Sequence, residues 1–234
     1  MNKINPFVII ATYNETENIK KLVPMLLSLE GINVLIIDDN SPDGTADIVN
    51  EFSAQSNSVY LIKREGKLGY GTAVMAGIKK AMELNASHII TMDADFSHDP
   101  AEIPNFIEAL KDSDMVIGSR YINGVRILNW ELSRLFLSVF ANKYVNFILG
   151  FDVTDCTSGF RGYRAEIFNK IDLSKITSNG YSFIVELLFK INKAGFTINE
   201  LPIIYSERRL GQSKMSKKVI WESFFKPWAL KFFG

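Results

Sequence analysis

Short runs rich in apolar residues recur along the first half of the chain, and each is followed by a polar turn and a stretch with helical spacing. The runs cover residues 7–10, 34–37, 59–62, 88–92 and 115–117. Continuous apolar runs that alternate with helices are typical of a parallel sheet buried on both faces. The pattern therefore predicts an α/β fold with a mostly parallel central sheet and flanking helices.

The pattern changes after Tyr121, where aromatic residues become more frequent. The spacing predicts a long helix over 130–149, a loop and strand over 155–164, a helix over 181–193, a strand over 197–207, a basic loop over 208–216 and a final amphipathic helix over 217–233. Pro202 favours an edge position for the last strand. We expect one domain over residues 1–215 and a C-terminal helix over 216–234 that packs on that domain or at a membrane interface.

The composition narrows the class of protein. Of 234 residues, 47% are hydrophobic and 22% charged, which is enough to form a core and excludes global disorder. The 26 basic residues balance 26 acidic ones, which argues against a nucleic-acid-binding protein. The single cysteine, Cys156, cannot form an internal disulfide, which favours an intracellular protein. We find no apolar segment long enough for a signal peptide or a membrane span, so we expect a protein that is soluble or attached to a membrane surface.

Polar clusters follow the predicted strands, at residues 13–15, 38–43, 93–95 and 119–120. In parallel α/β sheets, ligands bind at the carboxyl ends of the strands. We therefore expect these clusters to converge on one crevice.

Asp93 and Asp95 form the most specific of these clusters. Two carboxylates leave most of a Mg²⁺ coordination shell for water and phosphate, as Mg²⁺ prefers, whereas the alternative is a solvated turn. At the second strand end, Asp39 is placed to accept hydrogen bonds from a ribose or base, while Asp43 or Thr45 is expected to cap the next helix.

The remaining candidates are cations and isolated nucleophiles. Arg120 ends a predicted buried strand, and Lys214 lies in a flexible loop that suits a lid over a charged ligand. The glycine-rich stretch 67–71 lacks a phosphate-loop spacing and favours a plain turn. His88 and His98 have no zinc spacing, and Cys156 has no identifiable base. His98 is expected in a loop, with a position lining the crevice as the alternative.

The final helix places aromatic residues among lysines: Trp221, Phe224, Phe225, Trp228, Phe232 and Phe233 among Lys217, Lys218, Lys226 and Lys231. This pattern suits either core packing or an interfacial helix, whose aromatic residues sit at the lipid boundary.

Taken together, the motifs resemble those of family 2 glycosyltransferases with the GT-A fold, and more narrowly those of the dolichol-phosphate (polyprenol-phosphate) mannosyltransferases. The stretches that carry the resemblance are Ala11–Glu15, Asp38–Thr45, Asp93–His98, Gly118–Tyr121, Thr157–Arg161 and Gly211–Ser216.

The resemblance implies roles for individual residues. The nucleoside would be held by Ala11, Tyr13, Glu15, Ile37 and Asp39, and the donor also by Ala94. Asp93 and Asp95, with Ser97 as a third candidate, would hold Mg²⁺ or Mn²⁺ against the diphosphate. Arg208 and Lys214 would close over the donor, and Arg120 and Arg134 would face a lipid phosphate. The implied catalytic residues are Asp93, Asp95, Arg120 and Asp155.

The expected reaction transfers mannose from GDP-mannose to a polyprenyl phosphate with inversion. The acceptor phosphate is largely ionised at neutral pH, so no general base is required and Asp155 would orient the site. Two alternatives remain open: transfer from a UDP-sugar, and a non-catalytic nucleotide-sugar-binding subunit. We expect the protein at the cytoplasmic face of a membrane, attached by its own surface or through a membrane-anchoring partner subunit.

Overall fold

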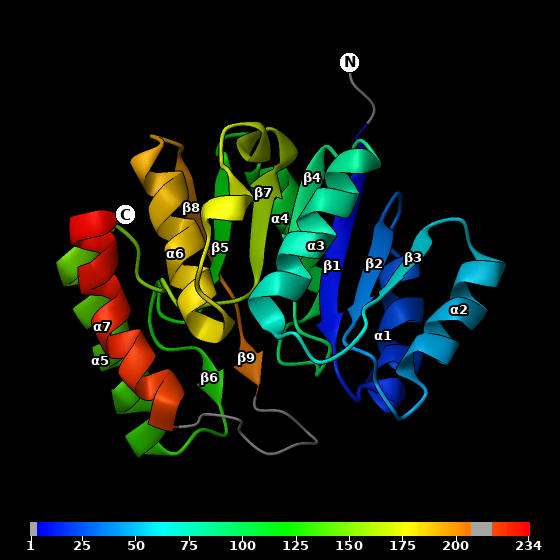
Figure 1. The fold of residues 1–234 in the computed structure, drawn as a ribbon, viewed down its shortest axis with the longest axis horizontal. Helices are drawn as coiled ribbons and strands as arrows, with labels where there is room; N and C mark the ends of the chain where they lie inside the picture. Colours follow the sequence, from blue (N-terminus) through cyan, green and yellow to red (C-terminus); the bar gives the residue numbers. More distant parts are fainter. Residues whose placement is uncertain (1–3, 207–216) are drawn as a thin grey trace.

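The computed structural model, which describes residues 4–206 and 217–234, has a central sheet with helices on both faces (Figure 1). Seven strands lie in the order β3-β2-β1-β4-β7-β5-β8. They are β1 (Pro6–Thr12), β2 (Asn33–Asp38), β3 (Val59–Lys63), β4 (His88–Thr91), β5 (Met115–Ser119), β7 (Arg161–Arg164) and β8 (Ile198–Pro202). Every neighbouring pair is parallel except the two that involve β7. The predicted α/β fold with a mostly parallel sheet is confirmed.

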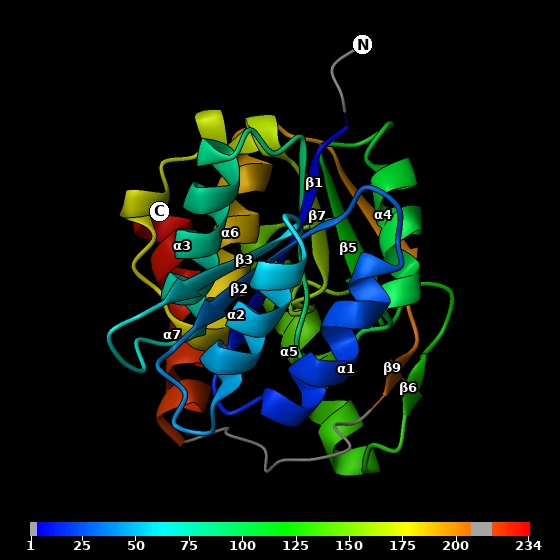
Figure 2. The same cartoon turned by 90° about the vertical axis from the view of Figure 1, so that its right-hand side faces the viewer.

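The continuous apolar runs exist because each strand faces two cores. In β1, Phe7 and Ile9 point into one core and Val8 and Ile10 into the other, and all four are buried. Figure 2 shows the helices on both sides of the sheet. The first core is covered by α3 (Tyr70–Glu83) and α6 (Gly180–Lys193), and the second by α1 (Thr16–Leu27), α2 (Thr45–Gln55) and α4 (Ile103–Ala109), which follows a short 3₁₀ turn at Pro100–Glu102.

The second half of the chain completes the sheet in a different order. Strand β7 lies antiparallel between β4 and β5, and its Gly162 lies opposite Ile90 and Val116. A Cβ on Gly162 would lie 3.0 Å from the Phe106 ring, so the central position of β7 depends on this glycine. Strand β8 lies at the sheet edge and ends at Pro202, as predicted.

Two helices form a further layer beside α6: α5 (Leu132–Leu149) and α7 (Lys217–Phe233). Helix α7 packs against both α5 and α6. Over residues 224–233, Pro227 and Leu230 are buried, whereas the exposed side carries Phe225, Phe232 and Phe233 beside Lys231, so this side is mainly aromatic. Within the described ranges, no helix combines the length and apolar character that crossing a bilayer requires.

Smaller elements connect these layers. A two-stranded parallel sheet, β6 (Ile127–Leu128) with β9 (Tyr205–Ser206), lies near the carboxyl ends of the main strands. Short 3₁₀ helices at Ala165–Asn169 and Leu173–Lys175 lead from β7 to α6. The boundary expected between residues 215 and 216 lies outside the described residues.

Gly77 provides a test of how closely α3 packs on the sheet. A Cβ at this position would lie 2.6 Å from Ile9 Cγ2 and 2.8 Å from Ile37 Cδ1. We expect Gly77→Ala to lower the free energy of unfolding by about 1–3 kcal/mol in urea titrations, because the clash outweighs the better helix propensity of alanine. The control Gly66→Ala adds a Cβ with no heavy atom within 4 Å and should be neutral. A Gly77→Ala protein as stable as the wild type would contradict this packing.

Candidate active site

Asp39 follows β2 directly and is held by a loop that lies 25–30 residues further along the chain. Its Oδ2 accepts a hydrogen bond from Gly69 N at 2.9 Å, and its Oδ1 lies 2.9 Å from Arg64 Nε, an ionic contact without hydrogen-bond alignment. In the same region, Lys67 Nζ lies 3.8 Å from the centre of the Tyr13 ring. The 67–71 stretch is therefore more than the plain turn that its spacing favoured, because it positions Asp39.

The other residues implied for the nucleoside are placed differently. Glu15 N donates to Thr45 Oγ1, and Ala11 packs partly buried against the first core. Ile37 is fully buried, and its side chain packs against α3. Gly44, rather than Asp43 or Thr45, occupies the N-cap position of α2. Asp43 nevertheless accepts hydrogen bonds from the backbone N of Thr45 and of Thr16, the first residues of α2 and α1.

The two carboxylates after β4 lie in a loop with a well-defined hydrogen-bond pattern. Asp95 Oδ1 accepts hydrogen bonds from Ser97 N at 3.1 Å and from Ser97 Oγ at 2.6 Å. Phe96 adopts a left-handed backbone conformation with φ of 61°. Ser97 is buried, so its hydroxyl serves to hold the Asp95 carboxylate in place.

His98 lies in this loop, as expected, but no local signal in the sequence pointed to its burial or to its contact with Asp93. It is buried, its ring stacks on Phe160 with centres 4.9 Å apart, and its Nδ1 accepts a hydrogen bond from Asp93 N. Burial lowers the pKa of the imidazole, an effect that the nearby Asp93 and Asp95 carboxylates only partly oppose. The ring is therefore neutral at pH 7, with its proton on Nε2, and it positions the backbone of Asp93.

The donor set in this loop fits a hard divalent cation. Asp93 and Asp95 offer carboxylate oxygens, which suit Mg²⁺ and Mn²⁺. In residues 4–206 and 217–234, no group of three or more His, Cys, Asp or Glu side chains is arranged to enclose a metal ion. An ion held here would take its remaining ligands from water or a bound phosphate, as Mg²⁺ commonly does.

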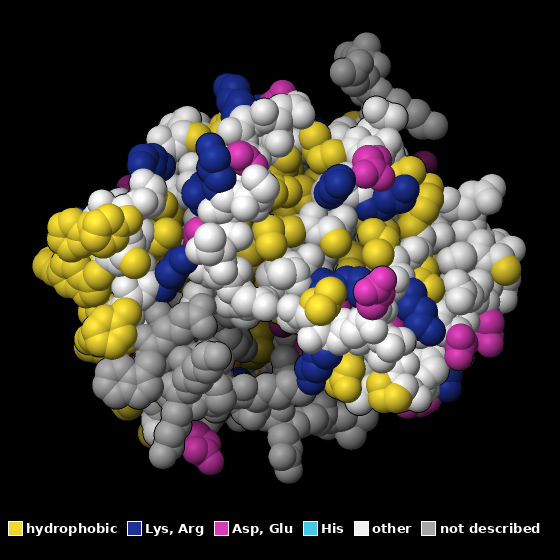
Figure 3. Space-filling model, in the orientation of Figure 1, with side chains coloured by type: hydrophobic (Ala, Val, Ile, Leu, Met, Phe, Trp, Pro, Cys, Tyr) yellow, Lys and Arg dark blue, Asp and Glu magenta, His cyan; other side chains and the backbone are white. Residues whose placement is uncertain are grey.

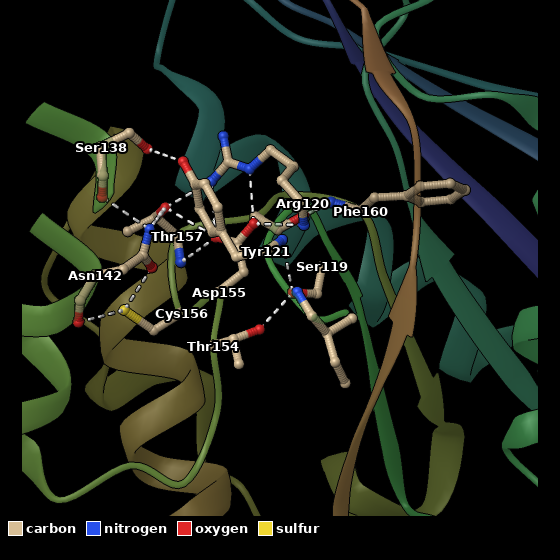
Figure 4. A network of polar contacts seen from close by, with 12 residues as sticks. Ser119, Arg120, Tyr121, Ser138, Asn142, Thr154, Asp155, Cys156, Thr157 and Phe160 are labelled. Atoms are coloured by element: carbon tan, nitrogen blue, oxygen red, sulfur yellow. Dashed lines mark hydrogen bonds and ion pairs between the residues drawn. The ribbon is translucent and has the colours of Figure 1, made fainter. Parts of the chain in front are cut away.

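Arg120 and Asp155 form a buried bidentate pair (Figure 4). Arg120 Nε donates to Asp155 Oδ2 at 2.6 Å, and Nη2 donates to Oδ1 at 2.7 Å and to Thr157 Oγ1 at 2.8 Å. Burial alone would raise the pKa of Asp155, but the guanidinium charge and its hydrogen bonds outweigh this effect and lower it. Three aromatic rings surround the guanidinium carbon at 5.4–5.7 Å: Tyr121, Trp130 and Tyr205.

Side chains from three other elements support this pair. Glu200 of β8 accepts hydrogen bonds from Asp155 N at 2.9 Å and from Thr154 N at 2.6 Å. Asn142 of α5 donates to Thr157 Oγ1 at 3.2 Å. The fully buried Arg161 donates to three backbone carbonyls, those of Cys156, Ser158 and Ile184. The loop that carries Asp155 is therefore fixed along its whole length.

Cys156 lies in this loop but is unsuited to nucleophilic chemistry. Its thiol is buried beside Asn142, and burial raises its pKa far above the ordinary value for cysteine. Nucleophilic cysteines require the thiolate form, which is suppressed here.

A cavity of about 270 Å³ lies between the strand ends and helices α5, α6 and α7. Its polar part includes Asp93, His98, Arg120, Arg134 and Thr157, and its apolar part includes Leu137, Phe140, Ala141, Tyr144, Val185 and Phe224. Arg134 lies with its guanidinium carbon 4.1 Å from the centre of the Trp130 ring. Tyr13 and Asp39 lie outside the lining of this cavity, so the residues after β1 and β2 form a separate, neighbouring region. Arg208 and Lys214 lie outside the described residues.

The pKa of Asp155 predicts how the pair contributes to stability. A carboxyl whose pKa is lower when folded contributes stability above its unfolded pKa and loses that contribution as the pH falls. We expect Asp155→Asn to lower the free energy of unfolding by about 3–5 kcal/mol at pH 7, because Arg120 stays buried without its counter-charge. In urea titrations, the difference from wild type should shrink below about pH 4.

The exposed Asp152→Asn in the same loop is the matched control and should leave stability unchanged. Equal stability of the Asp155→Asn and wild-type proteins at pH 7 would contradict the assignment of a stabilising buried pair.

Solved structures share this fold at low sequence identity. Glucosyl-3-phosphoglycerate synthase from Mycobacterium tuberculosis, in complex with Mn²⁺, uridine-diphosphate and phosphoglyceric acid, matches with a TM-score of 0.68 and 17% identity over 96% of this chain and 78% of that one. A mannosyltransferase from Pyrobaculum calidifontis, in complex with GDP-Man and Mn²⁺, matches with a TM-score of 0.59 and 14% identity over 97% of this chain and 72% of that one. The GT-A fold implied by the sequence motifs is confirmed.

Curated relatives are closer in sequence. Polyprenol monophosphomannose synthase from Mycolicibacterium smegmatis is 41% identical and aligns over 94% of this chain and 84% of that protein. Undecaprenyl-phosphate mannosyltransferase from Micrococcus luteus is 40% identical over 92% of this chain and 89% of that protein. The family model described as Glycosyl transferase family 2 matches residues 7–172, which include the carboxylate loop and the Arg120–Asp155 pair. The chain therefore belongs to glycosyltransferase family 2.

Proposed function

We propose that this protein transfers mannose from GDP-mannose to a polyprenyl phosphate, with inversion at the anomeric carbon. The observation that carries the proposal is the cavity, which joins Asp93, Arg120 and Arg134 to an aromatic and aliphatic wall on α5 and α7. A polyprenyl phosphate has the same two-part character, an anionic head on a long apolar chain. The names of the two relatives at about 40% identity, which describe mannose and polyprenyl phosphates, support this choice of substrates.

Arg120 is suited to bind the acceptor phosphate. Asp155 and Thr157 occupy Nε and Nη2, while Nη1 makes no hydrogen bond within the described part of the chain. The pair thus fixes the plane of the guanidinium and leaves donors for an anion, with Arg134 as a second cation in the same cavity. Because a phosphate monoester is largely ionised at neutral pH, its oxygen attacks without a general base. Asp155 then acts by orienting Arg120.

The donor is assigned to the neighbouring region. Tyr13, Glu15 and Asp39, with the backbone near Ala11 and Ala94, would bind the nucleoside, and Asp93 and Asp95 would hold Mg²⁺ or Mn²⁺. The bound cation would supply positive charge to the departing diphosphate. His98 keeps Asp93 in position, and burial lowers the pKa of its imidazole. Arg208 and Lys214 are proposed to close over the donor.

Replacement of Asp93 tests the proposed reaction. We expect wild-type protein with Mg²⁺ or Mn²⁺ and polyprenyl phosphate to make an acid-labile mannolipid from GDP-mannose. UDP-glucose and UDP-N-acetylglucosamine should yield none. We expect Asp93→Asn to reduce the rate by a factor of about 10²–10³ or more, because charge at the leaving group loses its stabilisation. The exposed Asp112→Asn serves as the matched control.

The outcomes separate the alternatives. A glycolipid made from a UDP-sugar would overturn the choice of donor, and near-normal transfer by Asp93→Asn would overturn the metal assignment. Donor binding by the wild type without any glycolipid product would favour a non-catalytic nucleotide-sugar-binding subunit.

The outer faces of α5 and α7 support attachment to a membrane surface. Large apolar side chains gather there, at the left edge of Figure 3. They include Leu132, Phe136, Phe140 and Phe147 on α5 and Phe225, Trp228, Phe232 and Phe233 on α7, with Phe147 84% and Phe233 90% exposed. Exposed aromatic groups of this kind mark interaction surfaces, and the same helices line the proposed acceptor cavity. We place this face at the cytoplasmic surface of the membrane that supplies the acceptor.

Vesicle binding tests this attachment. The triple variant Phe225→Ser, Phe232→Ser and Phe233→Ser should bind vesicles of phosphatidylcholine and phosphatidylglycerol at least about tenfold more weakly in co-sedimentation, because each phenylalanine loses its burial in the interface. Met25→Ser, which alters an exposed apolar residue on α1, should bind as the wild type does. Wild-type protein that does not bind vesicles would point instead to a membrane-anchoring partner subunit.

A further inference from the structure

Helix α7 supplies one wall of the cavity, through Phe224, Lys226 and Pro227. It is the last helix of the chain, and its outer side carries exposed aromatic residues. Among residues 224–233, the part of this helix whose side chains the structure describes, the contacts with α5 and α6 lie on the inner side. Two of these contacts are polar and lie within a single turn of the helix, at the cavity.

The first contact is an ion pair to α6. Lys226 Nζ lies 3.0 Å from Glu186 Oε2 and donates to Thr177 Oγ1 at 3.1 Å. The Glu186 carboxylate is 2% exposed and also accepts hydrogen bonds from Thr177 N and Ser178 N. A carboxylate buried in an apolar helix interface is costly unless it is paired. When α7 packs against α6, Lys226 supplies the positive charge that pairs with the buried Glu186 carboxylate.

The second contact joins α7 to α5 through one hydroxyl group. Tyr144 donates its hydroxyl hydrogen to the Phe224 carbonyl at 2.9 Å and accepts a hydrogen bond from Trp228 Nε1 at 2.9 Å. The rings of Tyr144 and Phe224 also stack, with centres 5.0 Å apart. Pro227, between the two bonded residues, has no backbone N–H to contribute to the helix. Tyr144 thus fixes the turn of α7 that faces the cavity.

We propose that Lys226 and Tyr144 are positioning residues that hold α7 as the apolar wall of the acceptor cavity and thereby select acceptors with a long prenyl chain. The inference rests on the proposed function, since it concerns the acceptor of that reaction. The two arginines proposed to bind the phosphate belong to other elements, since Arg120 follows β5 and Arg134 lies in α5. A short acceptor that occupies only the end beside these arginines does not depend on α7, whereas a long chain contacts the wall and loses affinity when the wall is displaced.

The test compares two acceptors in detergent solution, geranyl phosphate and undecaprenyl phosphate, with GDP-mannose as donor. For Lys226→Gln and Tyr144→Phe, the KM for undecaprenyl phosphate should rise about tenfold. The ratio of the KM for undecaprenyl phosphate to the KM for geranyl phosphate should rise by a similar factor, because the two arginines proposed to bind the phosphate lie on other elements. Lys226→Arg keeps the charge and should restore most of the long-chain affinity. Lys231→Gln, on the exposed side of the same helix, is the matched control.

A merely structural role for these residues would alter the KM values of both acceptors equally or lower the melting temperature without changing their ratio, and either result would overturn the inference. Unchanged KM for undecaprenyl phosphate in Tyr144→Phe, which removes only a hydroxyl group, would do the same. If wild-type protein makes no mannolipid from either acceptor, the proposed function itself fails. If the wild type does make mannolipid but the variants show the same ratio of acceptor KM values as the wild type, only the role of α7 is rejected.

Discussion

The buried pair between Arg120 and Asp155 couples the main parts of the site. Arg120 follows β5, Asp155 lies in the loop before β7, and that loop is held by Glu200 of β8 and Asn142 of α5. Neither charge tolerates burial without the other, since breaking such a pair costs several kcal/mol. The sheet edge and α5 must therefore adopt one relative position, and that position creates the cavity beside Arg120.

The site combines two kinds of construction. The region after β1, β2 and β4 is built by short loops on the sheet, where backbone and carboxylate groups hold one another, as in Asp95 with Ser97 and Asp39 with Gly69. The cavity is instead closed by helices α5 and α7, which lie outside the sheet and carry apolar side chains both inward and outward. For the proposed reaction, this division places a charged donor on the rigid sheet and an amphiphilic acceptor beside the exposed aromatic face.

Local patterns predicted much of this architecture because the physical cause is itself local. A strand covered on both faces must be apolar at every position, so the runs at residues 7–10 and 34–37 identified buried parallel strands. Pro202 cannot donate to a ladder, and β8 does lie at the sheet edge. Asp43 accepts a hydrogen bond from Thr45 N at the start of α2, close by in the sequence, and one from Thr16 N at the start of α1. The ordered motifs identified the family, which the matches to known proteins confirm.

The sequence by itself thus determined the alternating elements, the sheet and the family, while tertiary contacts decided how the side chains work. His98 is a buried partner of Asp93 because Phe160, 62 positions later, covers its ring. The side chain of Ile37, a residue implied for the nucleoside site, faces the core against Gly77. The pairings of Arg120 with Asp155 and of Glu186 with Lys226 join residues 35 and 40 positions apart. No local periodicity encodes such pairings, because they arise only when separate elements pack together and a buried charge must find its partner.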